Sequence, residues 1–443
     1  MEDINLSNRE YERFLSEPLS KPDYMALANG ITQDNRPRNT ERKHNYVMYH
    51  CHTEYSLLDS ATQYPDYIEL AVKNGMKAIS FSEHGNLYNW TEKWGACKEV
   101  GLKYIHSVEV YLTETHEEKI RDNYHTVLMA KNYEGMLELT NLVSASFEDD
   151  HKYYKNRISF EEFLNTSDNI ISTSACLASP LCKLPEDHPM FEALVKKYTF
   201  LEIQPHNLEE QKVFNQKLLW LAKKYDKPLI VGTDTHSSSP YKAECRTVFM
   251  AMKDIEFTNE DKCDLSFKTY DELCEMFRKQ NAIPEEEWLE ALENTNLLYD
   301  MVEDIELDTS IKYPILYGSP ENDAKKFTEL TYHNFEEKVR NGIISSEQVE
   351  NFETAIKEEL RVFEKVGMCG FMLCQSETVT WCKEQGFTIG TARGSVGGSR
   401  VAYVTDIIDL NPETWNTVFS RFCNEDRVEI GDQSLGLPVQ RCA

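Results

Sequence analysis

The sequence of 443 residues lacks several features that would place it in a simple class. No apolar run approaches the roughly 20 residues that a membrane-spanning helix needs. Residues 1–5 have neither the basic start nor the apolar core of a secretory signal. The twelve cysteines are scattered, without a Cys-x-x-Cys pair. These absences favour a cytoplasmic protein with reduced thiols.

Basic charge is also scarce, since 47 Lys and Arg face 75 Asp and Glu, for a net charge of -28. This balance argues against a simple polyanion-binding protein, which usually carries a basic surface. It does not exclude nucleic acid, because bound divalent cations can reverse the local sign of an acidic site. The length predicts two or three domains, each able to bury a core.

The order of elements predicts an α/β protein. Residues 1–44 form a polar arm with one short helix near residues 10–15. Strand-type runs then alternate with helical patterns such as 67–72 and 215–222, which predicts a parallel sheet, most simply a (β/α) barrel. The strand-type runs are 46–49, 78–81, 105–110, 126–129, 170–173, 200–203 and 229–232. The expected boundaries are a domain over 45–300 that ends in acidic helices at 270–302, a linker over 301–325 and a mixed second domain over 326–443.

Histidines gather at the ends of the predicted strands. His50 and His52 close the first strand on one face, because residues two apart on a strand point the same way. His84 follows the second strand, His125 opens another, and Asp234-Thr235-His236 closes the last. Strand ends share one rim of a barrel, so these side chains should converge there. Such a nitrogen-rich set suits Zn²⁺, Mn²⁺ or Fe²⁺ better than Mg²⁺ or Ca²⁺. A single histidine at a strand end more often has a structural role. The metal site is predicted because several such histidines occur together.

A second motif lies at 390–403, Gly-Thr-Ala-Arg-Gly-Ser-Val-Gly-Gly-Ser-Arg-Val-Ala-Tyr. It puts small residues and free backbone N–H groups in one turn, which can wrap a triphosphate beside Arg393 or Arg400. The run 401–404 that follows is typical of a helix start or a buried strand. A glycine-rich turn alone is also found in simple loops.

Residues 50–59, His-Cys-His-Thr-Glu-Tyr-Ser-Leu-Leu-Asp, resemble the opening of the PHP (polymerase and histidinol phosphatase) domain fused to C-family DNA polymerases. Residues 82–87, 107–111, 125–130, 174–177 and 233–236 resemble its later motifs in order. The resemblance implies a distorted (β/α)7-type barrel. It assigns nine metal ligands, all ligand-type residues here: His50, His52, Asp59, His84, Glu109, His125, Cys176, Asp234 and His236. Cys51, Cys97, Cys182 and His206 are interpreted as packing or nearby polar residues.

An intact ligand set implies a metal-dependent 3′–5′ exonuclease that removes misincorporated nucleotides, with Zn²⁺, Mn²⁺ or Fe²⁺ as cofactor. A cysteine among the ligands favours the softer Zn²⁺. One alternative is a free-standing metallophosphoesterase acting on small esters, like the histidinol phosphatase branch. Another is a non-catalytic scaffold that only docks a partner.

Residues 359–427 resemble the start of the palm of the same polymerases, of the DNA polymerase III alpha type. The resemblance implies an α+β partial palm of nucleotidyltransferase type with Mg²⁺ and a deoxynucleoside triphosphate. The nucleotide-binding residues would be Arg393, Gly394, Ser395, Gly398 and Ser399. It argues against the small-ester alternative, which has no use for a palm.

The resemblance breaks at the polymerase carboxylates. Asp432 matches the first of them, whereas Ser434 and Gly436 stand where the others are expected. Two-metal nucleotidyl transfer needs at least two converging carboxylates. We therefore expect an interrupted or split polymerase that does not extend a primer alone. Its implied partners are the primer 3′ end of DNA, a second chain carrying the rest, and through that part a sliding clamp and other replisome subunits. The expected location is the bacterial cytoplasm or a phage-infected cell.

Overall fold

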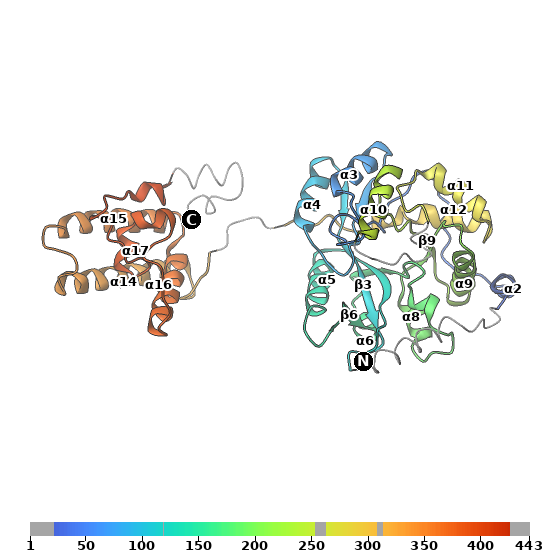
Figure 1. Cartoon of the computed structure of the whole chain (residues 1–443), viewed down its shortest axis with the longest axis horizontal. Helices are drawn as coiled ribbons and strands as arrows, with labels where there is room; N and C mark the ends of the chain where they lie inside the picture. Colours follow the sequence, from blue (N-terminus) through green and yellow to red (C-terminus); the bar gives the residue numbers. More distant parts are fainter. Residues whose placement is uncertain (1–21, 118, 253–262, 308–312, 426–443) are drawn as a thin grey trace. The chain divides into compact units, whose positions relative to one another are not determined.

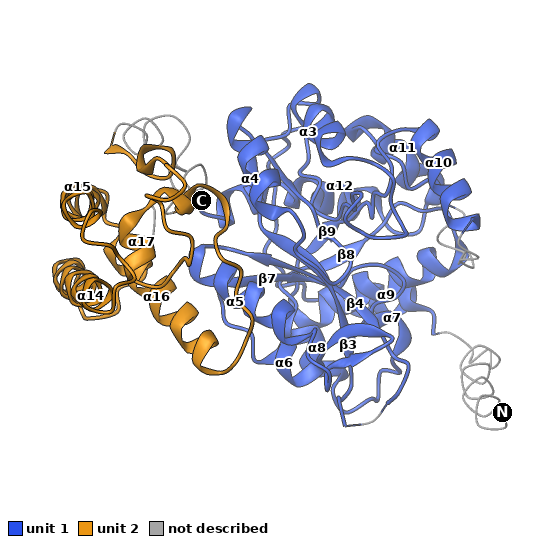
Figure 2. Ribbon diagram, turned by 60° about the vertical axis from the view of Figure 1, so that its left-hand side comes forward, with its two compact units in different colours: residues 1–306 blue, residues 307–443 orange. Residues whose placement is uncertain are grey.

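The computed structural model describes residues 22–117, 119–252, 263–307 and 313–425. The chain divides into two compact units, residues 1–306 (unit 1) and residues 307–443 (unit 2), shown in Figure 1 and coloured separately in Figure 2. Within the described residues, no helix has the length and apolar character that a membrane crossing requires.

Unit 1 is built on short strands that alternate with helices, which confirms the predicted α/β architecture. The strands are β1 (Ala78–Ser80), β2 (Lys103–Ile105), β3 (Ser107–Thr113), β4 (Tyr124–Ala130), β5 (Lys152–Tyr153), β6 (Lys155–Ser159), β7 (Ile170–Thr173), β8 (Leu201–Ile203) and β9 (Leu229–Val231). Pairs β1–β2, β3–β6 and β8–β9 are parallel. The short strands β5 and β6, which the sequence patterns do not indicate, form a hairpin.

Single bridges close these strands into a distorted barrel. Thr173 and Phe200 join β7 to β8, while Met48 and Cys51 place the segment 46–52 between β1 and the residues after β9. His52 N donates to Thr235 O at 2.8 Å, and Thr235 N donates to His50 O at 3.1 Å. The expected strand at 46–49 therefore contributes bridges to the ring rather than a regular ladder.

The predicted parallel sheet is interrupted at β4, which runs antiparallel to both β3 and β7. A parallel return needs a long crossover, usually a helix. The described residues between Thr113 and Tyr124 contain no helix. The chain therefore turns back, and the start of β4 lies at the rim where the other strands end. This reversal explains how His125, at the beginning of its strand, reaches a site built from strand ends.

The helices of unit 1 surround the barrel (Figure 2). They are α2 (Tyr24–Gly30), α3 (Tyr64–Lys73), α4 (Trp90–Glu99), α5 (Tyr133–Ala145), α6 (Phe160–Leu164), α7 (Pro180–Lys183), α8 (Phe191–Lys197), α9 (Glu209–Tyr225), α10 (Pro240–Ala251), α11 (Tyr270–Gln280), α12 (Glu285–Asn294) and α13 (Leu297–Met301). In α9, Phe214, Leu218, Leu221 and Ala222 are buried at the spacing of one helix face.

One layer of apolar side chains fills the barrel. It takes alternate residues of the strands, because successive strand residues point to opposite faces. Its members include Val47, Ala78, Ile105, Val127, Ile171, Phe200 and Ile230, with Leu298 of α13 packed among them. Their neighbours, such as Ile79, Leu128 and Leu201, belong to the larger core that includes the surrounding helices.

Residues 22–44 do not stand apart as the expected arm. The helix α2 packs against α9. Residues 34–45, which we call the strap, lie along α12: Arg36 pairs with Glu287 at 3.1 Å, and Lys43 N donates to Glu293 at 2.7 Å. The short helix expected at 10–15 lies outside the described residues.

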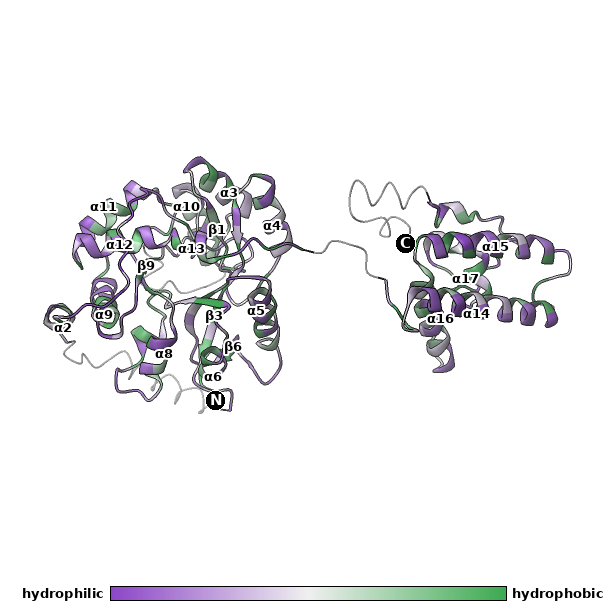
Figure 3. Cartoon of the chain, turned by 180° about the vertical axis from the view of Figure 1, so that it is seen from behind, coloured by the Kyte–Doolittle hydropathy of each residue, from purple (hydrophilic) through white to green (hydrophobic). Residues whose placement is uncertain are grey.

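Unit 2 differs from the expected α+β palm, because residues 313–425 form helices without a strand. The elements are α14 (Pro320–Arg340), α15 (Val349–Lys365), α16 (Cys369–Glu384), η2 (Gly394–Gly398), α17 (Arg400–Val404) and η3 (Phe419–Arg421). Figure 3 shows polar and apolar residues alternating along α14 and α15. Phe327, Phe352 and Phe363 are fully buried in a core that includes the short helix α17.

Candidate metal centre

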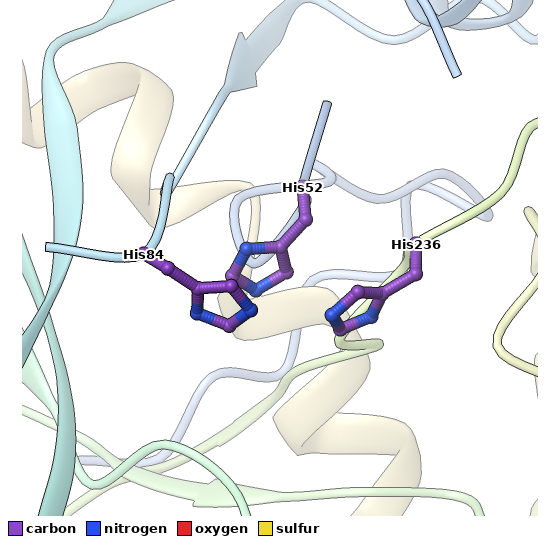
Figure 4. A group of neighbouring side chains, drawn as sticks. All are labelled: His52, His84 and His236. Atoms are coloured by element: carbon purple, nitrogen blue, oxygen red, sulfur yellow. The ribbon is translucent and has the colours of Figure 1, made fainter. Parts of the chain in front are cut away.

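Nine predicted ligands converge at one rim of the barrel. His50 and His52 end the first barrel segment, Asp59 follows in the next loop, and His84 comes four residues after β1. Glu109 lies on β3 and His125 on β4. Cys176 follows β7, and Asp234 and His236 follow β9. Figure 4 shows the rings of His52, His84 and His236 turned toward one another.

The donor atoms form three overlapping groups, each with its atoms within 4.8 Å of one another. One consists of His52, His84 and His236, another of His50, His52 and Glu109, and the third of Glu109, His125 and Cys176. His52 and Glu109 each belong to two groups. Such sharing is what a cluster of neighbouring ions with bridging ligands requires.

Three carboxylates link the histidines. Glu109 lies 3.0 Å from His125 Nδ1 and 3.3 Å from His50 Nε2 through Oε1, and 2.6 Å from His84 Nδ1 through Oε2. Asp59 Oδ2 lies 2.8 Å from His84 Nε2 and 3.2 Å from His236 Nε2. Each carboxylate thus faces several histidine nitrogens at once.

Asp234 holds the inner part of the centre, with Oδ1 at 3.3 Å from His50 Nε2 and 3.1 Å from His52 Nε2. Its backbone is left-handed, with φ at 46°. Aspartate tolerates this conformation better than most residues.

Buried donor atoms at the centre are left without hydrogen bonds. In the described part of the chain, four buried atoms form no hydrogen bond although pairs of them lie 3.1–3.3 Å apart: His50 Nε2, His52 Nε2, Glu109 Oε1 and Asp234 Oδ1. An unsatisfied buried polar group costs about 1–3 kcal/mol. Coordination to a cation would satisfy these atoms, and the mixture of nitrogen, oxygen and sulfur donors fits a transition metal.

His52 and Glu109 have the protonation states of metal ligands, whereas the carboxylates beside His84 favour its protonated form. Burial, together with the neighbouring His84 and His236, lowers the pKa of His52 to about 3, so this ring is neutral at pH 7. Burial raises the pKa of Glu109, but His125 and His84 outweigh it and hold that pKa well below the usual range. Burial likewise lowers the pKa of His84, while Glu109 and Asp59 outweigh it and raise that pKa to about 10.

Several residues that the motifs do not identify orient the ligands. Glu202 is fully buried and lies 2.6 Å from His50 Nδ1. Ser56 Oγ lies 3.0 Å from His52 Nδ1, and Arg246 Nε donates to the Asp59 carbonyl at 2.7 Å. Fixing the far nitrogen of a histidine sets which nitrogen faces the metal.

A sequence signal for Glu202 exists in hindsight. It is the one charged residue within an apolar barrel strand, Leu201–Ile203, and Gly232 follows the neighbouring strand. A Cβ added at Gly232 would lie 1.9 Å from Glu202 Oε1. The glycine therefore makes room for the carboxylate. The residues interpreted as packing are placed accordingly: Cys51, Cys97 and His206 are buried, and Cys182 is half-buried.

The glycine-rich turn of unit 2 divides the five predicted nucleotide-binding residues into two sets. Arg393 and Gly394 are exposed and Ser395 is half-buried. Gly398 and Ser399 are buried: a Cβ at Gly398 would lie 2.5 Å from Val418 O, and Ser399 caps α17 by accepting from Ala402 N. The second set thus shapes the turn from inside.

Two further residues support this turn: Arg400, which the sequence offers as an alternative phosphate contact, and Glu359, which the sequence analysis does not single out. Arg400 donates to Glu413 at 2.7 Å and to the carbonyl oxygens of Gly398 and Thr417. Buried Glu359 accepts from Ser399 Oγ at 2.7 Å and from the backbone N–H groups of residues 400 and 401. The guanidinium of Arg400 is thus engaged within the protein. Asp432, the predicted palm carboxylate, lies outside the described residues.

Comparison with known proteins agrees with both motifs. Residues 48–206 match the PHP domain family, and residues 325–441 match the bacterial DNA polymerase III alpha NTPase domain. The DNA polymerase III alpha subunit of Aquifex aeolicus is 30% identical over 418 residues, covering 87% of this chain and 36% of that protein. The chain corresponds to the N-terminal portion of DNA polymerase III alpha subunits. Seven of the nine converging residues lie inside the PHP match, and Asp234 and His236 lie beyond it.

A second alpha subunit is covered to a similar extent. The alpha subunit of Borreliella burgdorferi is 27% identical, covering 87% of this chain and 34% of that protein. The chain thus spans about a third of the length of these relatives. A crystal structure of a putative metal-dependent phosphoesterase from Bifidobacterium adolescentis aligns over 46% of this chain and 91% of its own, with 16% identity and a TM-score of 0.32.

Proposed function

We propose that unit 1 is a metal-dependent 3′–5′ exonuclease within the N-terminal portion of a bacterial replicative DNA polymerase. The observation that carries the proposal is the set of four buried donor atoms without hydrogen bonds at the point where nine ligand-type side chains meet. In a scaffold that binds no metal, these unsatisfied atoms would lower the stability of the fold without any compensating interaction.

Zn²⁺ or Mn²⁺ is the cofactor that we assign, with Fe²⁺ fitting the same donors. Cys176 lies 3.5 Å from His125 Nδ1, and a thiolate there favours Zn²⁺. When bound, the cations supply Lewis acidity to a phosphate and acidify a water molecule. The chain's own residues provide the holding groups: ionised Glu109, Asp59 and Asp234, with His50 oriented by Glu202.

The substrate that we propose is the 3′ end of a DNA primer. The chain carries a net charge of -28, so DNA approaches against its charge. Cations at the rim reverse the sign locally, where the phosphates must bind. The site would therefore take a strand end that its cations can hold rather than a long stretch of duplex.

We infer that unit 2 contacts the phosphates of a deoxynucleoside triphosphate, with Mg²⁺, through the outer part of the turn. Arg393, Gly394 and Ser395 lie at its exposed side. Gly394 has φ at 66°, a conformation that lets successive N–H groups point to one side. We assign Gly398 and Ser399 a supporting role. Polymerisation and a cytoplasmic location are proposals that rest on the relatives.

The test of the exonuclease uses the full chain and a 5′-labelled primer with a mismatched 3′ end, in Mn²⁺ or Zn²⁺. We expect progressive shortening from the 3′ end. Asp234→Asn and His236→Ala should each lower the rate at least about 100-fold, because the first removes the charge of a ligand and the second removes a ligand altogether. The control is His188→Ala, a partly exposed histidine of unit 1 outside the nine.

Circular dichroism would verify that the variants remain folded. Cleavage by Asp234→Asn at the wild-type rate would show that the activity belongs elsewhere. A protein that releases phosphate from small esters but leaves the primer intact would instead favour the small-ester phosphoesterase.

A further inference from the structure

A second cluster of metal-type ligands lies in unit 1, outside the nine-residue centre. His116 follows β3, His151 precedes β5, and Glu162 lies on α6. His116 Nε2 lies 2.8 Å from Glu162 Oε2, and His151 Nε2 lies 3.0 Å from Glu162 Oε1. The two imidazole rings have their centroids 4.1 Å apart. All three side chains are partly buried, and one donor atom from each lies within 4.8 Å of the others.

The cluster is separate from the centre at the barrel rim. Glu109, the shared ligand of the centre, lies on β3 four residues before the strand ends at Thr113. At about 3.3 Å per strand residue, this distance along β3 alone is on the order of 13 Å. His116 lies three residues further along the chain. An ion held here could not share ligands with the centre.

The spacing suits a small cation. Zn²⁺ binds histidine nitrogen and carboxylate oxygen at about 2.0–2.2 Å, so tetrahedral ligands are roughly 3.3–3.5 Å apart. The two nitrogen–oxygen distances, 2.8 and 3.0 Å, are those of hydrogen bonds. Opening each by about half an ångström would admit the ion. Two histidines and one carboxylate leave a fourth position for water.

The ligands are already oriented by neighbouring groups. His151 Nδ1 lies 2.8 Å from Asp150 Oδ1, so the ring proton is placed on Nδ1. The lone pair of Nε2 is then the one that binds a metal ion. Glu162 is held in the capping box of α6: Ser159 N and Ser159 Oγ both donate to its Oε2, at 2.6 and 2.8 Å. His116 Nδ1 is buried and has no hydrogen-bond partner among the described residues. The bonding of this ring within the protein is therefore incomplete.

We propose that His116, His151 and Glu162 bind one Zn²⁺ ion. The ion joins the loop after β3 to two segments more than thirty residues further along the chain, the turn before β5 and the start of α6. Arg157 already fastens the same loop, with Nη1 donating to the carbonyl oxygens of Ile120 and Asp122. The role of the site is to fix this loop, which connects two strands of the centre, β3 with Glu109 and β4 with His125.

The first experiment measures bound zinc in the full chain, reconstituted with Zn²⁺ alone and counted by elemental analysis. His116→Ala and His151→Ala should each bind one equivalent less than the wild type, because each removes one of three ligands. His188→Ala is the matched control: it is a partly exposed histidine of the same unit whose partner is Glu114, not Glu162. It should keep the full count.

The second experiment uses Asp150→Asn, a change at an exposed carboxylate that leaves all three ligands in place. Loss of such an orienting partner typically weakens metal binding about 10–100-fold. Competition with a chromophoric chelator would measure the shift. The same variant should fold like the wild type, so a loss of affinity cannot be ascribed to unfolding.

The outcome also separates this site from the proposed exonuclease. If the rim centre binds no zinc but this site does, the wild type binds one equivalent of zinc and His151→Ala binds none. If only this site fails, His116→Ala and His151→Ala retain the wild-type zinc count and Asp150→Asn the wild-type affinity, which overturns the proposal. Full exonuclease activity in His151→Ala, with one zinc lost, would support the ion but overturn its role in fixing the loop between β3 and β4.

Discussion

Replacing Glu202 by glutamine would test how strongly the interior of the barrel controls the metal centre. The Glu202 carboxylate accepts from Tyr49 OH at 2.9 Å and Thr173 Oγ1 at 2.7 Å on one oxygen. On the other it meets His50 Nδ1 at 2.6 Å and Gln204 Nε2 at 2.9 Å. A glutamine can keep its oxygen toward His50 and turn its amide toward the two hydroxyls, which can rotate to accept. The substitution therefore removes charge and preserves the hydrogen-bond geometry.

The expected loss follows from that change in charge. His50 would donate to a neutral oxygen instead of a carboxylate, so its Nε2 becomes a weaker base toward the ion. Loss of such a partner typically costs about 10–100-fold in metal affinity, or roughly 1.4–2.7 kcal/mol. We expect the Mn²⁺ concentration that gives half-maximal exonuclease rate to rise by that factor. At saturating Mn²⁺ most of the rate should return.

The matched control is Glu293→Gln. Glu293 is also buried, but it accepts from the backbone N–H groups of Lys43 and His44 in the strap and from Tyr270 OH, and none of these partners is one of the nine ligands. Backbone donors cannot rotate, so this variant should lose about 1–3 kcal/mol of unfolding free energy and keep its metal affinity. Equal half-saturating Mn²⁺ for Glu202→Gln and the wild type would refute the reasoning.

Three further outcomes are expected. Burial raises the pKa of Glu359 to about 7 from its usual 4.5, so the folded state binds this proton more tightly than the unfolded state. The stabilisation of unit 2 by this proton should be complete below pH 4.5. By pH 7 the free energy of unfolding should have fallen by about 3 kcal/mol. Comparing denaturant unfolding of the wild type and Glu359→Gln across that range measures the slope, and identical slopes would contradict it. Gly398→Ala should destabilise unit 2 by at least about 1–3 kcal/mol, because the new methyl group would lie 2.5 Å from Val418 O. The control is Gly390→Ala, where the methyl group enters open space and the free energy of unfolding should not change. Chelation should lower the thermal midpoint of unit 1, since ions at 100 times their Kd contribute about 2.7 kcal/mol; an unchanged midpoint in calorimetry would show that no ion stabilises the fold.

The histidines and Asp234 could be predicted because they lie at the ends of predicted strands. Asp59, Glu109 and Cys176 came only from the resemblance of their motifs to the PHP domain. Glu202 stands out in sequence only as the charged residue of β8. Its role could not be predicted, because Tyr49, His50 and Thr173 reach it only when the barrel closes. The orienting role of Arg246 has the same origin, because Asp59 is distant in sequence. Whether each of the nine binds a metal is still a prediction.

Strand direction was the main failure of the sequence patterns in unit 1. A buried strand such as β4 has the same apolar pattern whichever way it runs, so only its short helix-free connection to β3 indicates the antiparallel return. In unit 2 the apolar run Val401–Val404 suits a strand or a helix equally. Ser399 decides in favour of the helix, because its side chain accepts from Ala402 N at the first turn.

The strap has a consequence for how the chain folds on the ribosome. Its contacts join residues about 250 positions apart, such as Lys43 with Glu293 and Asn45 with Asn296. At roughly 5–20 residues per second, on the order of 10–50 s pass between the synthesis of the two partners. The segment that carries His50 and His52 therefore leaves the ribosome before Thr235 is synthesised. Thr235 is the residue to which this segment hydrogen-bonds on one side. The part of unit 1 made first is therefore the last to be secured, and a nascent chain stalled before α12 would present an open barrel edge to chaperones.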